Sequence, residues 1–559
     1  MAIDLTPEQR KVGEANFKKA VDGLGLNRRE FLKAGSVATA AVAGTAAAAY
    51  FGYKSALGRP VKAALIGGGD EGGVLVGEHN PEFLQFVAVC DIRPSNMKRI
   101  FDGDPKVALR KGFNKVYGKN EAAKIKKYDD YRQMLRDNPE VEAVVIALPL
   151  HLHAKAAIDA MQIGKERGKP IHVLTEKLMA WNIQQCKAMI RKAKETGSIL
   201  SVGHQRHYSL LYAHAVEVIR SGEYLGDIKH IRALWHRNFS WPFKADPKMK
   251  LVKDKGVTQP FYRDGWFPPV THEDYDVLKD KVQQYGFDNV EQLVRWRLYA
   301  ETGGGLMAEL GSHQLDACSI FLGHKRPLAV TGVGGKFFFG KGRNDRNIDD
   351  HVFCTYEFPG KNYDTDKNDM VVVTYSSVST NSFENYGECL MGTRGSMVVE
   401  SEKTVMLYTE KDPTKKGPAN GRSLEVSVAK AKAGEAALDT SSTWGGPSAV
   451  QTAVTVAGGA APAPISRGYR EEMEDFAYCV RLWDPKEGYA PEEGEKGHTS
   501  YKQRLPRCHG EVAMADAIVA LTANRAMHER QRIVFDDKWF DSAKDDVPDD
   551  PKAKPKIPV

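Results

Sequence analysis

The strongest constraint on the fold is an apolar run that leads directly into a cluster of glycines. Residues 61–66 (VKAALI) are typical of a short buried strand, and Gly67, Gly69 and Gly72 follow with the spacing G-x-G-x-x-G. In such a turn the first glycine permits the bend and the second lets a pyrophosphate approach the backbone. The third lets the next helix pack closely on the strand. The segment predicts a strand, a turn and a helix that bind a nucleotide.

Glycines after a strand also form ordinary turns, so the distance to the next strand matters. A second apolar run, residues 86–90, ends in Asp91, about 20 residues after Gly72. An acidic side chain at this point can hold the adenosine ribose hydroxyls, which favours NAD. Arg93 could instead pair with the 2′-phosphate of NADP, so both cofactors stay open.

The alternation of strands and helices continues along the chain. The sequence predicts strands over 142–149 and 171–175, with a helix over 154–161 between them. Open α/β sheets bind ligands at the carboxyl ends of their strands. The candidates that follow these two strands are Pro149, His151, His153, Glu176 and Lys177. We expect them at the cofactor crevice, and the alternative for the two histidines is a solvated or capping role.

Further short motifs follow between residues 176 and 316. Residues 176–178 (EKL) are close to E-K-P, and residues 202–208 (VGHQRHY) and a glycine run at 303–305 come next. Residues 309–316 (ELGSHQLD) are close to D-x-G-x-H-x-x-D. Together with the glycine turn and Asp91, these motifs resemble the Gfo/Idh/MocA family of NAD(P)-dependent oxidoreductases.

Two positions depart from the family pattern. Leu178 replaces the proline of E-K-P, which removes a rigid φ, so Lys177 is expected to sit either differently or more loosely. Glu309 replaces the aspartate and lengthens the carboxylate arm by one methylene group.

Glu309, His313 and Asp316 are spaced to share one helical face. Three interpretations are open: a histidine tuned by carboxylates for proton transfer, a metal trio, or a polar helix face. No fourth ligand has a diagnostic spacing, so we expect no metal, and the resemblance favours catalysis. The expected catalytic residues are Lys177, His313 and Glu309. The expected cofactor-binding residues are Gly67, Gly69, Gly72, Asp91, Arg93, Pro149, His153 and Glu176, and the resemblance places His204, Arg206, Tyr208 and Asp316 on the substrate side.

The segment before the glycine turn carries an export pattern. Arg28 and Arg29 precede an uncharged stretch rich in Ala and Gly that runs from residue 34 to about residue 53. This is typical of a twin-arginine signal, which predicts the twin-arginine translocase as a partner and a periplasmic or otherwise exported protein. The alternative is an uncleaved membrane anchor, although such a stretch is weakly hydrophobic for a permanent span.

The expected fold class is α/β. An N-terminal Rossmann domain with a doubly wound parallel sheet precedes an α+β domain with an open, mainly antiparallel sheet, which the resemblance implies. The expected divisions are a signal and linker at 1–58, the NAD(P)-binding domain at 59–180, the substrate and oligomerisation domain at 181–540, and a disordered tail at 541–559. The second domain is expected to hold insertions near 241–289 and 409–466. Strands are expected in it over 229–236, 330–339, 350–358, 370–377, 388–391, 396–408 and 532–535, and helices over 183–196, 469–482 and 510–530.

Aromatic and charged side chains near the first insertion could serve a sugar site. They are Tyr262, Arg263, Trp266, Trp296 and Arg297. A solvated surface excursion held by a few aromatic side chains is the alternative.

Composition excludes several classes of protein. A formal net charge of +7, with both signs spread along the chain, is too mild for a nucleic-acid-binding protein. The seven cysteines include no C-x-x-C pair, which argues against a disulfide scaffold and a zinc finger. The resemblance implies a carbohydrate substrate and a homo-oligomer built through the second sheet.

Export limits the reactions that this protein could catalyse. Little free NAD exists outside the cytoplasm, so we expect a cofactor that does not dissociate between turnovers. An exchange of hydride between two sugars, as in glucose–fructose oxidoreductase-like members, meets this requirement. NAD-dependent glycoside cleavage through transient oxidation and elimination is the alternative, and a non-catalytic sugar-binding protein of the same fold is the third.

Overall fold

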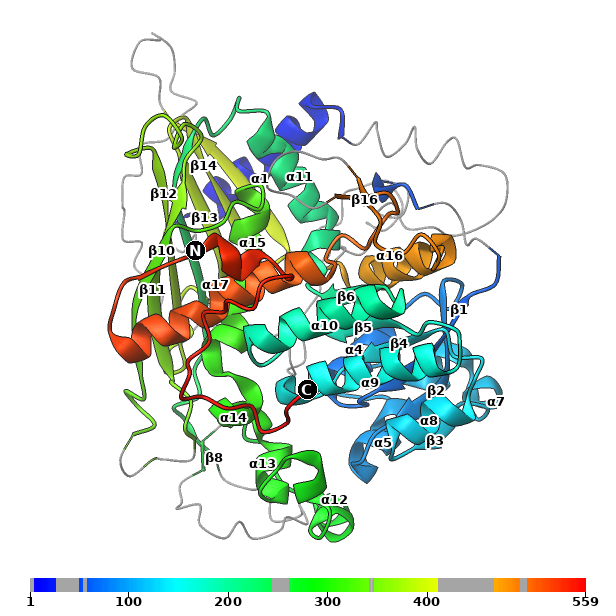
Figure 1. Cartoon of the computed structure of the whole chain (residues 1–559). Coiled ribbons are helices and arrows are strands. Elements are labelled where there is room, and N and C mark those ends of the chain that lie inside the picture. Colours follow the sequence, from blue (N-terminus) through cyan, green and yellow to red (C-terminus); the bar gives the residue numbers. More distant parts are fainter. Residues whose placement is uncertain are drawn as a thin grey trace.

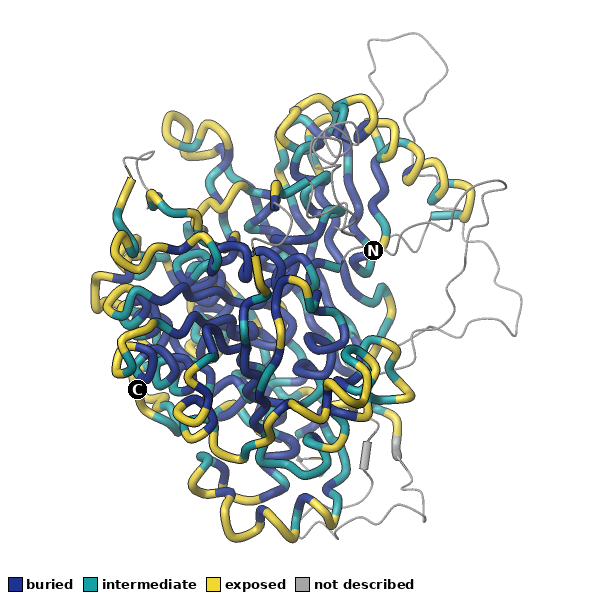
Figure 2. The backbone as a smooth tube through the Cα atoms, turned by 90° about the vertical axis from the view of Figure 1, so that its right-hand side faces the viewer, coloured by how far each residue is buried: buried dark blue, intermediate teal, exposed yellow. Residues whose placement is uncertain are grey.

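The computed structural model describes residues 5–26, 50–53, 58–243, 261–262, 264–340, 343, 346–410, 467–492 and 500–559. In this part of the chain two main sheets lie side by side, with helices between them and over the outer faces of the first (Figure 1). Buried backbone runs through the middle of the molecule, and the exposed residues lie on its periphery (Figure 2).

The first sheet has six strands, all parallel, in the order β3-β2-β1-β4-β5-β6. Its strands are β1 (Val61–Ile66), β2 (Leu84–Cys90), β3 (Lys126–Tyr128), β4 (Ala143–Ile146), β5 (His172–Glu176) and β6 (Leu200–Gly203). The main helices that connect them are α4 (Asp70–Glu78), α5 (Pro94–Asp102), α8 (Tyr131–Asp137), α9 (His153–Glu166) and α10 (Ile183–Thr196). Strands β4 and β5 are buried along their whole length, as expected for a parallel sheet covered on both faces. The predicted Rossmann sheet is confirmed.

The nucleotide-binding domain extends beyond the expected boundary at residue 180. Strand β6 pairs with β5, and Gly203 lies opposite Glu176. The helix expected to open the second domain, α10, therefore belongs to the first. The boundary falls near residue 204 because the sixth strand completes the sheet.

The second sheet has eight strands in the order β15-β14-β13-β7-β12-β11-β10-β18. Its strands are β7 (Ile228–His236), β10 (Ala329–Gly335), β11 (His351–Pro359), β12 (Met370–Val378), β13 (Tyr386–Gly392), β14 (Gly395–Glu400), β15 (Thr404–Thr409) and β18 (Ile533–Val534). Only the β7–β12 pair within this sheet is parallel. Burial alternates strictly along β12, so one face packs on the core and the other faces outward. The expected open, mainly antiparallel sheet is confirmed.

One expected strand is a hairpin instead. The segment expected as a single strand over 396–408 forms β14 and β15, with a turn between them. Ser401 and Glu402 in that turn have φ of 53° and 58°. Neither is glycine, so the turn carries no sequence signal of the usual kind.

Of the two long helices that follow the second sheet, one packs on the first domain and the other joins the two domains. Helix α16 (Tyr469–Leu482) packs on the first sheet beside β1 and β2. The first half of α17 (Gly510–Glu529) packs in the core of the first domain and its second half in the core of the second. Helix α15 (Ser312–Phe321) lies against the second sheet and contacts α17.

The tail expected to be disordered is folded onto the first domain. The Asp549 carboxylate accepts hydrogen bonds from the backbone N–H groups of Ile183 and Gln184 at the start of α10. The Lys187 ammonium donates to four backbone carbonyls of residues 538–546. A helix N-terminus and a buried lysine thus hold a segment that composition alone marks as disordered.

Several expectations fall outside the described residues. Arg28, Arg29 and most of the Ala-rich stretch are among them, as are nearly all of the second insertion and the side chains of Tyr262 and Arg263. Helix α1 (Pro7–Gly23) is described and packs on β15, and its Arg10 pairs with Glu400 at the end of β14. Among the helices of the described residues, none is long and apolar enough to cross a membrane.

Candidate functional site

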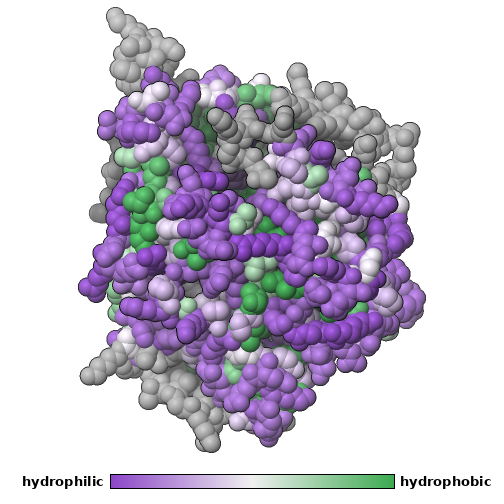
Figure 3. Space-filling view, viewed as in Figure 1, coloured by the Kyte–Doolittle hydropathy of each residue, from purple (hydrophilic) through white to green (hydrophobic). Residues whose placement is uncertain are grey.

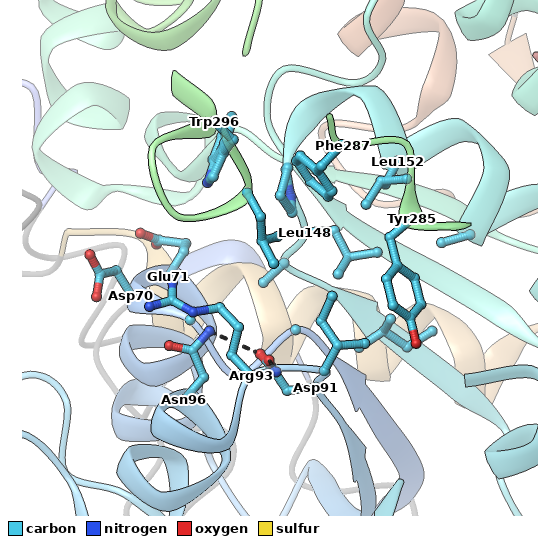
Figure 4. Close-up of a pocket in the computed structure, with 18 of the residues that line it drawn as sticks. Asp70, Glu71, Asp91, Arg93, Asn96, Leu148, Leu152, Tyr285, Phe287 and Trp296 are labelled. Carbon is cyan, nitrogen blue, oxygen red and sulfur yellow. Dashed lines mark hydrogen bonds between the residues drawn. The ribbon is translucent and has the colours of Figure 1, made fainter. Parts of the chain in front are cut away.

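A cavity of about 440 Å³ lies at the carboxyl ends of the strands of the first sheet (Figure 4). Residues of both domains line it. The first domain contributes the glycine turn, Asp91, Pro149, Glu176 and Lys177, and the segment after β7 contributes Trp266, Trp296, Arg297 and Glu309. The carboxyl edge of the parallel sheet thus forms one side of the cavity, and residues from the second half of the chain form the other side.

The three glycines of the turn differ in how closely other atoms approach them. Gly67 has φ of 103°, and a Cβ there would come within 2.3 Å of the Ala147 carbonyl oxygen. A Cβ on Gly72 would lie 2.1 Å from the Gly67 carbonyl oxygen. Gly69 differs because its nearest neighbour, Asn96 Nδ2, is 3.8 Å away. The first and third glycines shape the turn, and the second leaves room beside the cavity for a diphosphate.

The Asp91 carboxylate is fixed at the end of β2. It accepts hydrogen bonds from the backbone N–H groups of Gly68 (2.7 Å) and Arg93 (2.7 Å) and from the Asn96 amide (3.2 Å). Burial raises the pKa of Asp91, and these donors oppose that effect. Each carboxylate oxygen accepts several hydrogen bonds, so Asp91 can still take ribose hydroxyls. In Figure 4, Phe287 and Trp296 lie across the cavity from Asp91.

Arg93 is already paired within the chain. Its Nε and Nη2 donate to Asp274 Oδ2 at 3.0 and 2.9 Å, and the Asp274 side chain is fully buried in α12 (His272–Leu278). A guanidinium that is neutralised in this way is a poor partner for a 2′-phosphate. The site therefore fits NAD better than NADP.

His153 does not line the cavity. Its two ring nitrogens bond to the carbonyl oxygens of Leu178 (2.9 Å) and Leu148 (2.8 Å). The ring thereby ties the loop after β4 to the loop after β5. His153 positions the cofactor crevice, whereas Pro149 lines it as expected.

Lys177 is buried at the inner end of the cavity. Its ammonium donates to the Glu309 carbonyl oxygen at 2.9 Å, and only 6% of the residue is exposed. The peptide bond between Lys177 and Leu178 is cis. Burial lowers the pKa of Lys177, and the Glu309 and Glu176 carboxylates oppose that shift. Its burial and its hydrogen bond hold Lys177 in place, so of the two expected effects of losing the proline the looser position is not observed.

Glu309 lies in a π-helical turn, η5 (Met307–Gly311), directly before α15. Its carboxylate accepts a hydrogen bond from Arg297 Nε at 3.0 Å. Such single π-turns often occur at functional sites. The turn brings the Glu309 carbonyl to Lys177 and its carboxylate to the cavity.

His313 is buried in α15 and is not part of the cavity lining. Its ring lies 5.4 Å from that of Trp235, and its Nε2 has no hydrogen-bond partner among the described residues. Burial, reinforced by the charges of Lys177 and Arg206, lowers the pKa of His313 well below the ordinary value. The imidazole is therefore neutral, and burial and the nearby charges disfavour its protonated form.

The four residues expected on the substrate side lie elsewhere. Arg206 is 1% exposed and binds Glu388 and Glu402, and the Tyr208 hydroxyl accepts the Cys508 N–H within the core of the first domain. None of the four lines the cavity. The geometry assigns Arg206 and Tyr208 to the packing of the protein. His204 and Asp316 belong to a separate buried cluster.

The cavity also holds residues that the sequence did not single out. Asn96 holds Asp91, and Glu71 lies buried at the start of α4, where burial raises its pKa to about 7. A partly protonated Glu71 would repel a diphosphate less than a fully ionised carboxylate does. In the sequence, the acidic residue inside the glycine motif could have indicated that Glu71 belongs to the site. Trp266, Trp296 and Arg297, expected only as weak candidates, do line the cavity.

Comparison with known proteins agrees with this architecture. Residues 61–204 match the family model described as "Oxidoreductase family, NAD-binding Rossmann fold", and residues 282–398 match "GFO/IDH/MocA C-terminal domain". Two separate stretches of the chain are thus similar to the two domains of Gfo/Idh/MocA proteins. The first stretch matches the model of an NAD-binding Rossmann fold, and both matched stretches fall on the sheets described above.

Three proteins that are similar to this chain differ in their names and activities. The chain is 24% identical over 235 residues to a scyllo-inositol 2-dehydrogenase (NAD(+)) of Bacillus subtilis, covering 39% of this chain and 60% of that protein. It is 26% identical over 237 residues to a glycosyl hydrolase family 109 protein of Shewanella baltica, covering 39% and 48%. The matched region thus spans only about half the length of these relatives. A solved levoglucosan dehydrogenase, in complex with NADH and levoglucosan, shares the fold, with a TM-score of 0.51 and 16% identity over 86% of this chain and 100% of that one.

Proposed function

We propose that the chain is an NAD-dependent oxidoreductase that transfers a hydride to and from a carbinol of a sugar or polyol. One observation carries the proposal: a single cavity joins the glycine turn and Asp91 to Lys177 and Glu309. The relative named scyllo-inositol 2-dehydrogenase supports a polyhydroxylated substrate. The Arg93–Asp274 pair supports NAD over NADP.

Oxidation of a carbinol requires the loss of a hydride from carbon and of a proton from oxygen. Bound NAD supplies the hydride acceptor, so the protein must orient the hydroxyl and take its proton. Lys177 lines the cavity, and its lowered pKa favours the neutral amine, which suits it to contact the hydroxyl and take its proton. His313 lies outside the cavity lining and its pKa is lowered, so it would act as a neutral neighbour of Lys177 rather than hold the proton. Arg297 fixes the Glu309 carboxylate beside them.

The proposed enzyme is exported in the folded state with its cofactor. The support is the Arg28–Arg29 pair and the Ala-rich stretch that follows. A cofactor that stays bound needs a second substrate to restore it. We therefore favour an exchange in which one sugar reduces NAD⁺ and another reoxidises NADH, as in glucose–fructose oxidoreductase-like enzymes.

A second candidate function is glycoside cleavage through transient oxidation. The observation in its favour is the similarity to a glycosyl hydrolase family 109 protein. The same cofactor and lysine could oxidise a sugar carbon, acidify the neighbouring C–H and expel the glycosidic oxygen. The cofactor would end the cycle in its starting state.

The test uses the full chain purified without added nucleotide. The reduced-nicotinamide absorbance is followed while free sugars, polyols and aryl glycosides are added one at a time. Reduction by one sugar and reoxidation by a second supports the oxidoreductase. Release of the aglycone without a net absorbance change supports glycoside cleavage. A bound nucleotide that responds to no sugar supports a non-catalytic binding protein, and a chain without nucleotide overturns the retained-cofactor proposal.

The outer face of the second sheet is the proposed contact of a homo-oligomer. Val333 and Phe353 are cross-strand neighbours on β10 and β11, and 63% and 42% of their surfaces are exposed. Figure 3 shows a hydrophobic area over this sheet. Exposed apolar patches of this kind mark contact surfaces. Light scattering on the wild type and on Phe353→Glu tests the contact, since the charge should lower the observed mass.

A further inference from the structure

A second cluster of ionisable side chains lies outside the cavity lining. Its members are His204 after β6, His207 in the short helix η2 (Gln205–Tyr208), Asp316 in α15 and Asp516 in α17. His207 is the most exposed of the four, at 7%. Four elements of both domains therefore bring two imidazoles and two carboxylates to one buried point.

The ligand atoms are close to the spacing of a metal site. His207 Nε2 lies 2.7 Å from Asp316 Oδ1 and 3.8 Å from Asp516 Oδ2, and His204 Nδ1 lies 3.7 Å from Asp316 Oδ2. Ligand atoms of His204, Asp316 and Asp516 all lie within 4.8 Å of one another, and so do those of His207, Cys508 and Asp516. A tetrahedral ion with bonds of about 2.0–2.2 Å holds its ligands roughly 3.3–3.5 Å apart. Around such an ion the 3.7 and 3.8 Å distances would shorten slightly. The 2.7 Å distance between His207 and Asp316 would lengthen.

Several polar atoms of the cluster point to a missing ligand. Both ring nitrogens of His204, Oδ2 of Asp316 and Oδ2 of Asp516 are buried and have no hydrogen-bond partner among the described residues. Each such atom costs roughly 1–3 kcal/mol when nothing satisfies it. A cation would satisfy both carboxylates and one nitrogen of each imidazole.

We infer that His204, His207, Asp316 and Asp516 form a buried structural site for a divalent transition metal ion, with zinc as the best-fitting occupant. Imidazole nitrogens and carboxylate oxygens are ordinary zinc ligands, and four protein ligands leave no open position for a substrate. The Cys508 sulfur lies within 4.8 Å of the His207 and Asp516 ligand atoms and so borders the site.

The site would link the two halves of the catalytic centre. His204 directly follows β6, and Asp316 lies one turn beyond His313 on α15. An ion bound to both would hold α15 against the first domain, with Asp516 of α17 as a third anchor. Such an ion would be taken up as the chain folds, because the site is closed.

The test measures metal content in the full-length protein. The chain is produced in medium supplemented with zinc or cobalt, desalted in metal-free buffer and assayed by elemental analysis and visible spectroscopy. We expect about one ion per chain and, for cobalt, the absorbance bands of a four-coordinate ion. His204→Gln and Asp516→Asn should each lower the metal content at least fivefold, because each removes one of the four ligands.

A matched control is His79→Gln. His79 is also buried, but both of its ring nitrogens are paired, with the Val76 carbonyl and the Tyr117 hydroxyl. Its loss should leave the metal content unchanged. The inference fails if the wild type carries no metal above trace, or if His204→Gln and the wild type carry equal amounts. Should a variant fail to fold, the cobalt spectrum of the wild type decides, since absence of the four-coordinate bands overturns the site and indicates a cluster held by shared protons.

Discussion

Replacement of Arg206 by methionine separates a structural role from a substrate-binding one. The guanidinium is buried between two carboxylates: Nη1 lies 3.0 Å from Glu388, and Nη2 lies 2.6 Å from Glu402. Both carboxylates are also buried. Methionine keeps most of the length of the side chain and removes only the charge and the donors.

The expected cost follows from what the two carboxylates lose. Glu388 keeps hydrogen bonds from Tyr212 and Gln314, so it is not left wholly unpaired. Breaking a buried ion pair by removing one partner costs about 3–5 kcal/mol. At roughly 2–4 °C per kcal/mol for a domain of this size, the unfolding midpoint of Arg206→Met should fall by about 6–20 °C.

Thermal unfolding followed by circular dichroism measures the change. The matched control is Arg532→Met, which breaks an exposed pair with Glu357 and should cost less than about 1 kcal/mol. At temperatures where Arg206→Met is folded, its KM for sugar should match that of the wild type. An unfolding midpoint within about 2 °C of the wild type, together with a tenfold rise in KM, would refute the structural assignment.

Three further predictions concern the cavity. Asp274→Asn should free the Arg93 guanidinium and raise kcat/KM with NADP relative to NAD, as measured with both cofactors; an unchanged ratio contradicts the pairing argument. The affinity for NAD should fall as the pH rises through about 7, because Glu71 then ionises beside the diphosphate, and calorimetry should find no such fall in Glu71→Gln. Glu309→Gln removes a carboxylate that raises the pKa of Lys177, so the ascending limb of kcat/KM against pH should move to lower pH; movement to higher pH would be inconsistent with the assigned role.

The cofactor side could be predicted from the sequence because its signals are local. The turn needs glycine at residues 67 and 72 for steric reasons, and Asp91 follows at the end of the next strand. Parallel strands bring their carboxyl ends to one edge, which places Lys177 there as well. These features depend on backbone geometry that neighbouring residues dictate.

The substrate side could not be predicted in the same way. Arg206 and Tyr208 belong to a motif, but their partners, Glu388, Glu402 and the Cys508 backbone, lie far along the chain. Whether a polar side chain faces a cavity or another charge depends on such distant contacts. The same holds for the tail. Asp549 accepts a hydrogen bond from the start of α10, although the composition of its own segment predicts disorder.

The four-residue cluster shows the same limit for metal chemistry. The sequence predicted no metal because no spacing along the chain was diagnostic. His204 and Asp516 meet only because α17 crosses both cores.

The most direct test of the central claim is a single-turnover reduction of bound NAD in the wild type and in Lys177→Met. The substrate is the sugar or polyol that reduces the wild type best. The account predicts that both proteins hold NAD equally, while reduction in the variant is slower by about 10²–10⁴-fold. Equal rates of reduction in the two proteins, with NAD bound in both, would contradict it.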